Sequence, residues 1–320
     1  MSKRRIAAAA IGLFGAASLA SGAPAAEKLK VAIGQLGLWD TMVTVIASKK
    51  GFFKEQGLEI DYIKTRGGAD TVRAVTAGDR AIGMSNGILG AIAAYKKGLP
   101  VRIISSEMIG VDMFWIVRAD SKLKEPKDID GRTLGFSRPG SSTHLAVLAI
   151  AEHLGVKPKF VPVGGPPGSR TQVMSGQVDV GWQVAPFGVG LVQSGKARIL
   201  LKGDLAKSLS DVSVRVNIAN AKWLEANKAT AIKFLEVRKK TIAWMNGDGR
   251  GEAVKIWTEF NKKLDPKVAL AASNFYTAEQ MRLGPVAGVD KAIALAVKYK
   301  RIKQPLTEAE KKELFQVLVQ

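Results

Sequence analysis

Strand and helix patterns alternate along the first two-thirds of the sequence, and this order restricts the chain to an α/β fold. Apolar runs such as Leu29–Ile33 and Leu58–Ile63 predict buried strands. Helical patterns follow them, for example residues 69–77, which end at Gly78. Such alternation predicts parallel βαβ units with helices on both faces of a sheet. From Trp223 onward the pattern is almost wholly helical.

An internal repeat indicates two similar lobes. Residues 71–84 resemble residues 169–182, which lie 98 positions later. Each segment predicts a helix, a stop at Gly78 or Gly176, and a short strand with a glycine near its end. Each is followed by a further helix, a glycine and a strand that contains arginine. Chance likeness of α/β units is the alternative, but the matched order of elements favours duplicated lobes.

The first 25 residues have the pattern of a secretory signal peptide. Lys3, Arg4 and Arg5 precede an uncharged stretch at 6–20, and small residues at 23–25 form a cleavage site. The uncharged stretch is shorter than the roughly 20 residues that a membrane-spanning helix needs. We therefore expect a soluble, periplasmic protein that acts as a monomer. The pattern leaves open whether export uses the Sec or the twin-arginine route.

The chain has no cysteine and only two histidines, which excludes several kinds of chemistry. Disulfides, thiol nucleophiles, iron–sulfur clusters and Cys-based zinc sites are ruled out. His144 and His153 would face opposite sides of one helix, so they cannot share a metal ion. The net charge of +20 is spread along the chain, which predicts no nucleic-acid partner but favours anionic small ligands. We expect no catalytic residue, no metal and no cofactor.

Four predicted turns join a strand to a helix, which is where open α/β sheets bind ligands. They lie at 34–41, 84–87, 137–144 and 182–187. The third carries Gly140 followed by two serines and a threonine, so hydroxyl groups stand beside the free N–H groups of a helix start. That combination favours an anion. Plain helix capping by one of the serines is the alternative.

Aromatic and arginine side chains near the same turns extend the candidate site. Small-molecule pockets are mostly apolar with a few fixed polar groups. Core packing is the alternative for each tryptophan, and helix capping is the alternative for Asp40. Arg215 is the preferred anion partner because the chain should cross back between the lobes there. The candidate ligand-binding residues are Gln35, Trp39, Asp40, Ser85, Asn86, Trp115, Ser141, Ser142, Thr143, Gln183, Pro186 and Arg215.

A series of short motifs, in this order and at these spacings, resembles one protein family. The motifs are ASKKGFF at 47–53, GLE at 57–59, GDRAIG at 78–83, DIDG at 128–131, GSSTH at 140–144, GQVDV at 176–180 and Pro186. Together they resemble the periplasmic substrate-binding proteins of nitrate, taurine and aliphatic-sulfonate ABC importers. That family also includes binders of thiamine pyrimidine precursors and of aromatic acids.

The resemblance implies an α/β, two-lobed periplasmic binding protein fold (type II-like) with mixed or parallel sheets, helices on both faces and two hinge strands. The implied divisions are a signal peptide at 1–25, lobe 1 at 26–113 and 219–320, lobe 2 at 118–211, and hinges at 114–117 and 212–218. The resemblance also implies that Ser141, Ser142 and Thr143 hold an acidic head group, while Gln183 and Pro186 line the far wall.

The function implied is that of the solute-binding component of an ABC importer. It would capture a small organic anion, either sulfonate/taurine-like or carboxylate, and deliver it to a membrane permease and its ATPase. Asp40 would oppose a simple anion unless it binds an amino or hydroxyl group or only caps its helix. A pyrimidine or thiamine precursor, nitrate, or a sensing role with a membrane receptor remain alternatives. A related enzyme that makes a thiamine pyrimidine relies on a Cys-rich motif, so the lack of cysteine disfavours an enzyme.

Overall fold

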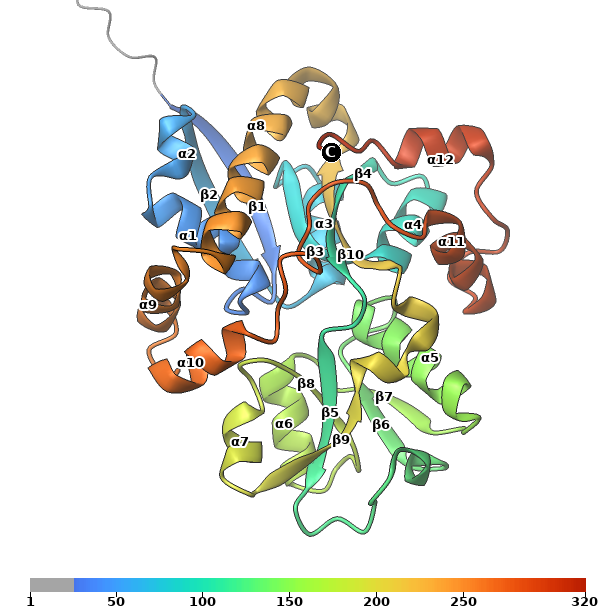
Figure 1. Ribbon diagram of the computed structural model, residues 1–320. Helices are drawn as coiled ribbons and strands as arrows, with labels where there is room; N and C mark the ends of the chain where they lie inside the picture. Colours follow the sequence, from blue (N-terminus) through green and yellow to red (C-terminus); the bar gives the residue numbers. More distant parts are fainter. Residues whose placement is uncertain (1–25) are drawn as a thin grey trace, which may run out of the picture.

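The computed structural model describes residues 26–320. The predicted signal peptide at 1–25 lies outside the described residues. Figure 1 shows two lobes stacked one above the other, each built around its own β-sheet, with the C-terminus in the upper lobe. Two α/β lobes with mixed sheets agree with the fold class predicted from the sequence.

Lobe 1 contains a mixed five-stranded sheet. Its order is β2 (Leu58–Thr65), β1 (Glu27–Gly34), β3 (Ile82–Gly87), β10 (Ser213–Asn220) and β4 (Val101–Ile109). β1 pairs in parallel with β2 and β3, whereas β10 runs antiparallel to both β3 and β4. The carboxyl ends of β1 and β3 therefore lie at the same edge, which faces lobe 2 (Figure 1).

Lobe 2 repeats this strand order. β8 (Gly181–Val184), β5 (Met113–Arg118) and β9 (Ala197–Lys202) form an antiparallel sheet, and β6 (Thr133–Phe136) pairs in parallel with β7 (Lys159–Pro162). A parallel bridge between Leu134 and Val180 joins β6 to the chain entering β8. The order β7-β6-β8-β5-β9 thus matches β2-β1-β3-β10-β4, with the strand arriving from the other lobe as the antiparallel one.

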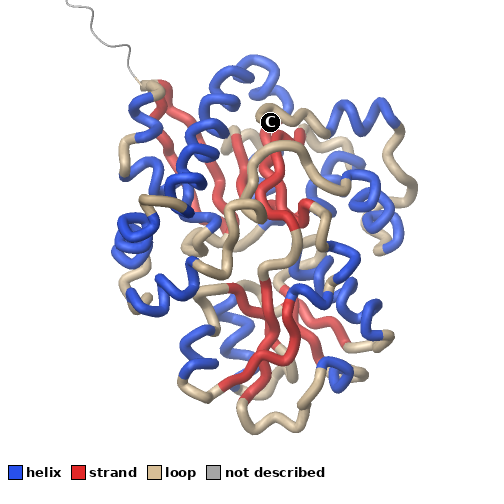
Figure 2. Tube along the Cα trace, in the orientation of Figure 1, coloured by secondary structure: helices blue, strands red, loops and turns tan. Residues whose placement is uncertain are grey.

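Helices cover both faces of the lobe 1 sheet and flank lobe 2 (Figure 2). Lobe 1 carries α1 (Val43–Lys49), α2 (Phe52–Glu55), α3 (Gly68–Thr76), α4 (Ile88–Lys96), α8 (Ala221–Asn246), α9 (Arg250–Phe260), α10 (Pro266–Ser273), α11 (Val289–Lys298) and α12 (Glu308–Leu314). Lobe 2 carries α5 (Ser142–Leu154), α6 (Pro166–Met174) and α7 (Val189–Gln193). Short 3-10 helices are η1 (Asp40–Met42), η2 (Pro126–Ile129), η3 (Gly203–Leu205) and η4 (Lys207–Leu209).

The two repeated segments, 71–84 and 169–182, form the same helix-on-strand contact in each lobe. A Cβ atom at Gly83 of β3 would lie 2.8 Å from the side chains of Thr71 and Val75 on α3. A Cβ atom at Gly181 of β8 would lie 2.8 Å from Ser169 on α6. Each glycine is required because its helix packs directly on the strand, so close packing explains why both copies of the repeat have glycine there.

The crossings between the lobes are displaced from the predicted hinge positions. Residues 114–117 belong to β5 in lobe 2, and residues 213–218 belong to β10 in lobe 1. The chain crosses just before each strand, at 110–112 and at 210–212. The Gly110 N–H donates to the Val212 carbonyl at 3.0 Å, so the two crossings lie side by side. The predicted hinges were wrong by a few residues because sheet pairing continues almost to the crossing.

The C-terminal segment returns along lobe 1. Gln316 and Leu318 donate backbone hydrogen bonds to Ile103 and Ile104 of β4, at 2.8 and 3.0 Å. Within residues 26–320, no helix combines the length and the apolar character needed to cross a membrane.

Candidate functional site

A pocket lies between the lobes, beyond the carboxyl ends of β1, β3, β6 and β8. Strand ends and helix starts from both lobes meet there, as ligand sites of open α/β sheets do. The cavity itself is about 30 Å³, within a space of about 410 Å³ when its open mouth is included. The lining residues are Gln35, Leu38, Gly68, Ser85, Gly87, Met113, Ser137, Ser141, Ser142, Thr143, Trp182, Val184 and Arg215.

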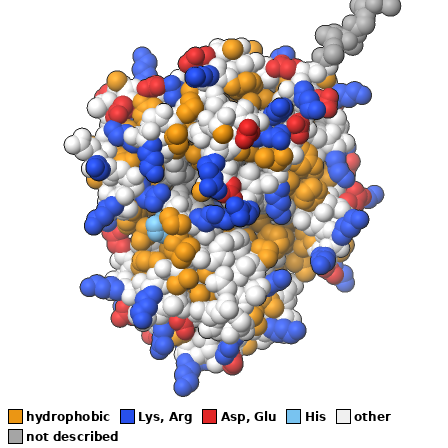
Figure 3. Space-filling view, turned by 180° about the vertical axis from the view of Figure 1, so that it is seen from behind, with side chains coloured by type: hydrophobic (Ala, Val, Ile, Leu, Met, Phe, Trp, Pro, Cys, Tyr) orange, Lys and Arg blue, Asp and Glu red, His pale blue; other side chains and the backbone are white. Residues whose placement is uncertain are grey.

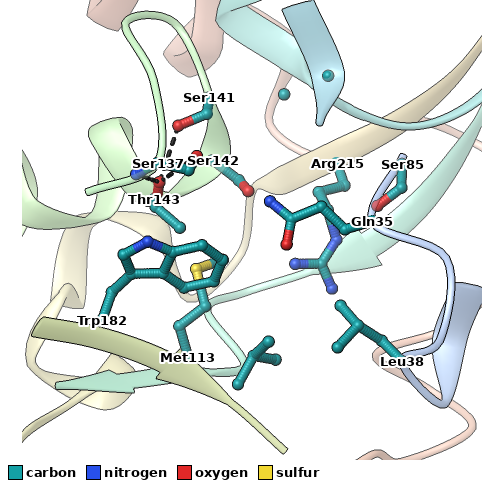
Figure 4. Close-up of a pocket in the computed structure, with 13 residues that line it drawn as sticks. Gln35, Leu38, Ser85, Met113, Ser137, Ser141, Ser142, Thr143, Trp182 and Arg215 are labelled. Atoms are coloured by element: carbon teal, nitrogen blue, oxygen red, sulfur yellow. Dashed lines mark hydrogen bonds between the residues drawn. The ribbon is translucent and has the colours of Figure 1, made fainter. Parts of the chain in front are cut away.

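The lobe 2 wall is the first turn of α5 with a chain of hydroxyl groups. Ser141 is the N-cap of α5, and its Oγ accepts from the His144 N–H at 3.2 Å. The Thr143 hydroxyl lies 2.8 Å from the hydroxyls of both Ser141 and Ser137 (Figure 4). The N–H groups of a first helical turn have no partner within the helix, and the helix dipole is positive there. This wall is therefore suited to hold an anionic group.

His144 holds the loop before α5 without adding charge. Its ring stacks on Phe136 with the centroids 4.5 Å apart, and its Nδ1 accepts from the Gly140 N–H at 3.2 Å. Burial, together with the positive charge of Arg301, lowers the pKa of His144 to about 4. The ring is thus neutral at pH 7, as its role as an acceptor requires.

The opposite wall, in lobe 1, is centred on a buried ion cluster around Arg215. Arg215 donates two hydrogen bonds to Asp112, at 2.9 and 2.7 Å, and one to Asp40 at 3.0 Å. All three side chains are at least 94% buried, since Arg215 is 6% exposed and both carboxylates are 1% or less. One guanidinium therefore faces two carboxyl groups, and the cluster presents no unbalanced positive charge to a ligand.

Burial and neighbouring charges shift the pKa values in this cluster. Burial raises the pKa of Asp40 to about 6; Arg215 opposes the rise, and Asp112 and Glu107 add to it. Burial alone would lower the pKa of Arg215, but the two carboxylates outweigh it and raise that pKa above its ordinary value. Arg215 stays charged, while Asp40 titrates closer to neutral pH than an exposed aspartate.

A second buried ion pair lies behind Ser85. Glu107 contacts Arg238 at 3.1 Å, and both side chains are 1% exposed. The other Glu107 oxygen accepts from the Ser85 N–H at 3.4 Å, and Arg238 also donates to Asn217 at 3.0 Å. Ser85 has a φ of +58°, a left-handed conformation that non-glycine residues rarely adopt. The pair thus anchors a strained backbone turn at the pocket wall.

Apolar side chains complete the pocket on a third side. Trp182 and Met113 lie between the hydroxyl cluster and the Arg215 wall in Figure 4, with Leu38 beyond them. The Trp182 indole N–H donates to the Gly164 carbonyl at 3.0 Å, which fixes the ring. This side suits the carbon skeleton of a small organic molecule.

The lobes meet closely at the pocket edge, through backbone. A Cβ atom at Gly87 would lie 2.8 Å from the Gly140 carbonyl oxygen and from the Ser142 nitrogen. A salt bridge between Lys298 on α11 and Glu152 on α5 also joins the two lobes. The absence of a side chain at Gly87 therefore allows the start of α5 to reach lobe 1.

Six of the twelve predicted ligand-binding residues line this pocket. They are Gln35, Ser85, Ser141, Ser142, Thr143 and Arg215. Three others lie in lobe 1 but away from the pocket. Trp39 packs on Trp257 at 5.1 Å, Asp40 is bonded to Arg215, and the Asn86 amide donates to the Gly83 and Val216 carbonyls.

The remaining three predicted residues belong to lobe 2 and also lie away from the pocket. The Trp115 indole N–H donates to the Gly135 carbonyl at 2.9 Å inside the lobe 2 core. The Gln183 amide donates to the Pro166 carbonyl at 3.1 Å. Pro186 lines a different groove on the surface. Each of these residues follows a strand or lies within one, as predicted, but its side chain is directed elsewhere.

Seven lining residues are absent from the predicted set. They are Leu38, Gly68, Gly87, Met113, Ser137, Trp182 and Val184. Ser137 follows strand β6 directly and lies in the predicted turn at 137–144, so its position was a usable signal. Met113 could not be found in this way, because it enters the site from the crossing between the lobes. Within residues 26–320, no group of three His, Asp or Glu side chains has a metal-binding arrangement.

Comparison with known sequences places this architecture in a family. Residues 40–249 match the family described as NMT1/THI5 like. The chain belongs to the NMT1/THI5-like family. This match includes Ser85, the start of α5, β8 and Arg215. The sequence resemblance to periplasmic substrate-binding proteins is thereby confirmed at the level of the family.

Individual relatives of this NMT1/THI5-like chain fall into two kinds. It is 29% identical to the taurine-binding periplasmic protein of Escherichia coli over 148 residues, 45% of each chain. It is 23% identical to the 4-amino-5-hydroxymethyl-2-methylpyrimidine phosphate synthase THI13 of Saccharomyces cerevisiae over 236 residues, 67% of this chain and 65% of the synthase. The alignments thus span less than two-thirds of either relative. The likeness to such synthases therefore extends to the sequence.

The fold itself has close counterparts among solved structures. The periplasmic aliphatic sulphonate binding protein SsuA of Escherichia coli superposes with a TM-score of 0.71. That superposition covers 90% of this chain and 92% of SsuA at 17% sequence identity. At this identity the likeness concerns the fold, and it confirms the two-lobed periplasmic binding protein architecture.

Proposed function

We propose that this protein is the exported solute-binding component of an ABC importer. It captures a small organic anion, sulfonate/taurine-like or carboxylate, between its lobes and delivers it to a membrane permease. The observation that carries the proposal is the first turn of α5, whose hydroxyls and N–H groups face a pocket shared by both lobes. Closure of two lobes over such a site is the motion by which periplasmic binding proteins capture ligands.

The two walls of the pocket favour a ligand with two different ends. The α5 wall provides hydrogen-bond donors and a positive dipole for an acidic head group. On the opposite wall, Arg215 is already neutralised by Asp40 and Asp112. Among the described residues, the buried Oε1 of Gln35 has no hydrogen-bond partner. A ligand amino or hydroxyl group would satisfy that acceptor, which makes a taurine-like or hydroxylated acid a better fit than a bare anion such as nitrate.

Arginines at the cleft rim favour approach of an anion. Asp70 on α3 is paired with Arg66 and Arg73 of its own lobe and lies 4.0 Å from Arg138 of lobe 2. Three guanidinium groups around one carboxylate leave a local positive excess, which steers anionic ligands toward the cleft. Figure 3 shows basic side chains gathered at mid-height on the rear face, the level at which the lobes meet.

A binding role is favoured over catalysis, although some relatives are named synthases. The chain contains no cysteine, whereas the family resemblance implies a Cys-rich motif in synthases of this kind. The predicted signal peptide supports export to the periplasm, and with it a permease partner. The same pocket could serve a sensing role. Because some relatives are named pyrimidine phosphate synthases, pyrimidines belong in the ligand screen beside acids.

A ligand screen tests the proposal. Purified protein lacking residues 1–25 is mixed with taurine, alkanesulfonates, small carboxylates, nitrate and pyrimidines, and thermal unfolding is followed. A ligand at 100 times its Kd should add about 2.7 kcal/mol of apparent stability. We expect a shift with an organic acid. A shift only with pyrimidines or nitrate, or with none of the compounds, would overturn the proposed ligand class.

Variants of the α5 wall test the location of the site. Ser141→Ala combined with Thr143→Val should weaken binding of the identified acid at least tenfold, because it removes two hydroxyls from the wall. Ser194→Ala is the matched control, since its exposed hydroxyl bonds only to Leu191 far from the pocket. Unchanged affinity in the double variant, with a normal unfolding transition, would exclude the α5 wall as the anion site.

A further inference from the structure

A second, larger groove lies between the lobes on the side of α10. One wall belongs to lobe 2 and comes from α6, α7 and the chain between β8 and α7; the other is the α9–α10 connection and α10 of lobe 1. Figure 1 shows α10 lying above α7 at this place. The groove has a volume of about 590 Å³, and none of its lining residues lines the central pocket.

The floor of this groove is apolar. Phe187 and Leu191 contribute from lobe 2, and Leu264 and Val268 contribute from lobe 1. All four are partly buried and pack against the hydrophobic core, so they form a fixed surface. A volume of this size lies in the range of roughly 300–1,000 Å³ that small-molecule sites occupy. The floor is thus large enough for an aromatic ring system or a medium-length alkyl chain.

The groove also carries unbalanced positive charge. Arg170, Lys262 and Lys263 line it and are exposed, and none of them forms an ion pair within residues 26–320. The carboxylate of the groove, Asp265, is engaged as the N-cap of α10, where it accepts from the Lys267 and Val268 N–H groups at 2.7 and 3.3 Å. Three cations therefore surround the apolar floor, and the carboxylate of Asp265 beside them is already hydrogen-bonded as a helix cap.

Buried residues separate this groove from the central pocket. The Tyr276 hydroxyl, from lobe 1, donates to the Ala185 carbonyl of lobe 2 at 2.7 Å. Ala185 precedes Pro186, which lines the groove. Tyr276 also lies near the carboxylates of the Arg215 cluster, since burial and these carboxylates together raise its pKa. Tyr276 thus stands between the two sites, and an occupant of the groove would not touch the α5 wall.

We propose that this groove is a second binding site, for an organic anion with an apolar body such as an aryl or alkyl sulfonate or carboxylate. The floor binds the apolar body, and Arg170, Lys262 and Lys263 bind the acidic group. Because the two walls belong to different lobes, occupancy favours the closed arrangement over an open one. The site uses none of the central-pocket residues, so it goes beyond the function proposed above.

The probe for this site is naphthalene-2-sulfonate, followed by isothermal titration calorimetry. Gly190 offers a way to fill the groove, because it lies exposed on α7 and a Cβ there would meet nothing within 4 Å. Gly190→Trp should weaken binding of the probe at least tenfold, whereas Gly190→Ala should leave it within twofold. Lys262→Gln combined with Lys263→Gln should weaken binding of the sulfonate severalfold but leave the binding of neutral 2-naphthol unchanged.

The outcomes distinguish this site from the central one. Absence of probe binding, or binding that Gly190→Trp does not weaken, would overturn the second site while leaving the proposed importer function intact. Conversely, the Ser141→Ala, Thr143→Val double variant should bind the probe normally; a tenfold loss there would place the probe in the central pocket and also overturn the second site. The small acid identified in the screen should bind the Lys262→Gln, Lys263→Gln variant as it binds the wild type.

Discussion

The Arg215 guanidinium donates a hydrogen bond of 3.0 Å to Asp40, although the two residues are 175 positions apart in the sequence. The contact joins β10, which follows the return crossing, to the first turn after β1. Asp112, beside the other crossing, completes the cluster. The charge of Asp40 therefore serves to fix Arg215 at the wall of the pocket, and an aspartate here is compatible with an anionic ligand.

Replacing Asp40 should alter how stability depends on pH. Its pKa is about 6 in the folded protein against an ordinary value of 3.8, so its stabilising contribution is complete below pH 3.8 and is lost as the pH rises through 6. At 1.36 kcal/mol per unit, the loss is about 3 kcal/mol between pH 3.8 and 7. In Asp40→Asn this loss should vanish, so its free energy of unfolding relative to wild type rises between pH 4 and 7.

Urea unfolding at several pH values measures that difference. Asp248→Asn is the control, because Asp248 is exposed. Its stability curve should run parallel to that of the wild type. If the Asp40→Asn curve also runs parallel to the wild-type curve, Asp40 does not titrate in this range.

Trp39 should matter for stability and not for direct ligand contact. The side chain is fully buried against Trp257. Removing a buried aromatic side chain costs about 3–5 kcal/mol, so Trp39→Ala should lower the free energy of unfolding by that amount in urea titrations. Trp39→Phe should lower the free energy of unfolding clearly less and keep ligand affinity within twofold of the wild-type value. A tenfold loss of affinity in a well-folded Trp39→Phe protein would show that Trp39 shapes the pocket.

Two substitutions at Ser85 separate backbone strain from hydroxyl chemistry. Ser85→Ala and Ser85→Gly both remove the hydroxyl, but only glycine adopts a φ of +58° without strain. Ser85→Gly should therefore be about 1 kcal/mol more stable than Ser85→Ala, since left-handed backbone costs about 1–2 kcal/mol. Both variants should show the same ligand affinity in calorimetry. Equal stabilities would mean that the turn relaxes in the alanine variant.

Adding a methyl group at Gly87 should hold the lobes apart. Its φ of −61° and ψ of 128° suit alanine, so lobe 1 should fold normally. The new Cβ would collide with backbone atoms of Gly140 and Ser142. Gly87→Ala should weaken ligand binding at least tenfold and increase the radius of gyration measured by small-angle X-ray scattering with ligand present.

Gly251→Ala provides the matched control for the closure test. Gly251 lies in α9, and a Cβ there meets open space. This variant should bind ligand normally and gain about 0.5–1 kcal/mol from the better helix former. If Gly87→Ala also binds normally, the contact between Gly87 and the α5 turn is not needed for closure.

The parts of the site that the sequence predicted are those that local signals determine. The turn between strand β6 and helix α5 lies where the sequence predicts it, at 137–144, because a short apolar run, a glycine turn and a serine cap are all local features. The hydroxyl wall follows directly from the start of α5. Arg215 was found because the chain had to cross between the lobes near it.

The errors arise where neighbouring residues point to opposite faces. Successive side chains of a strand alternate in direction. On β8, Trp182 lines the pocket while the adjacent Gln183 is bonded to Pro166 on the other face. On β3, Ser85 lines the pocket while Asn86 is bonded within the sheet. Choosing the right member of each pair requires the pairing partners of the strand, and these come from distant parts of the chain.

The position of the two crossings has a consequence for how the protein can be rebuilt. Lobe 2 is one continuous stretch between Gly110 and Val212, whose backbones are hydrogen-bonded to each other, whereas lobe 1 needs both ends of the described chain. A single DNA fragment therefore encodes the whole hydroxyl wall and can be exchanged as a cassette between related genes. The Arg215 wall, by contrast, is divided: Asp40 and Arg215 are encoded on either side of that fragment and would stay behind in the recipient, whereas Asp112 would move with the fragment.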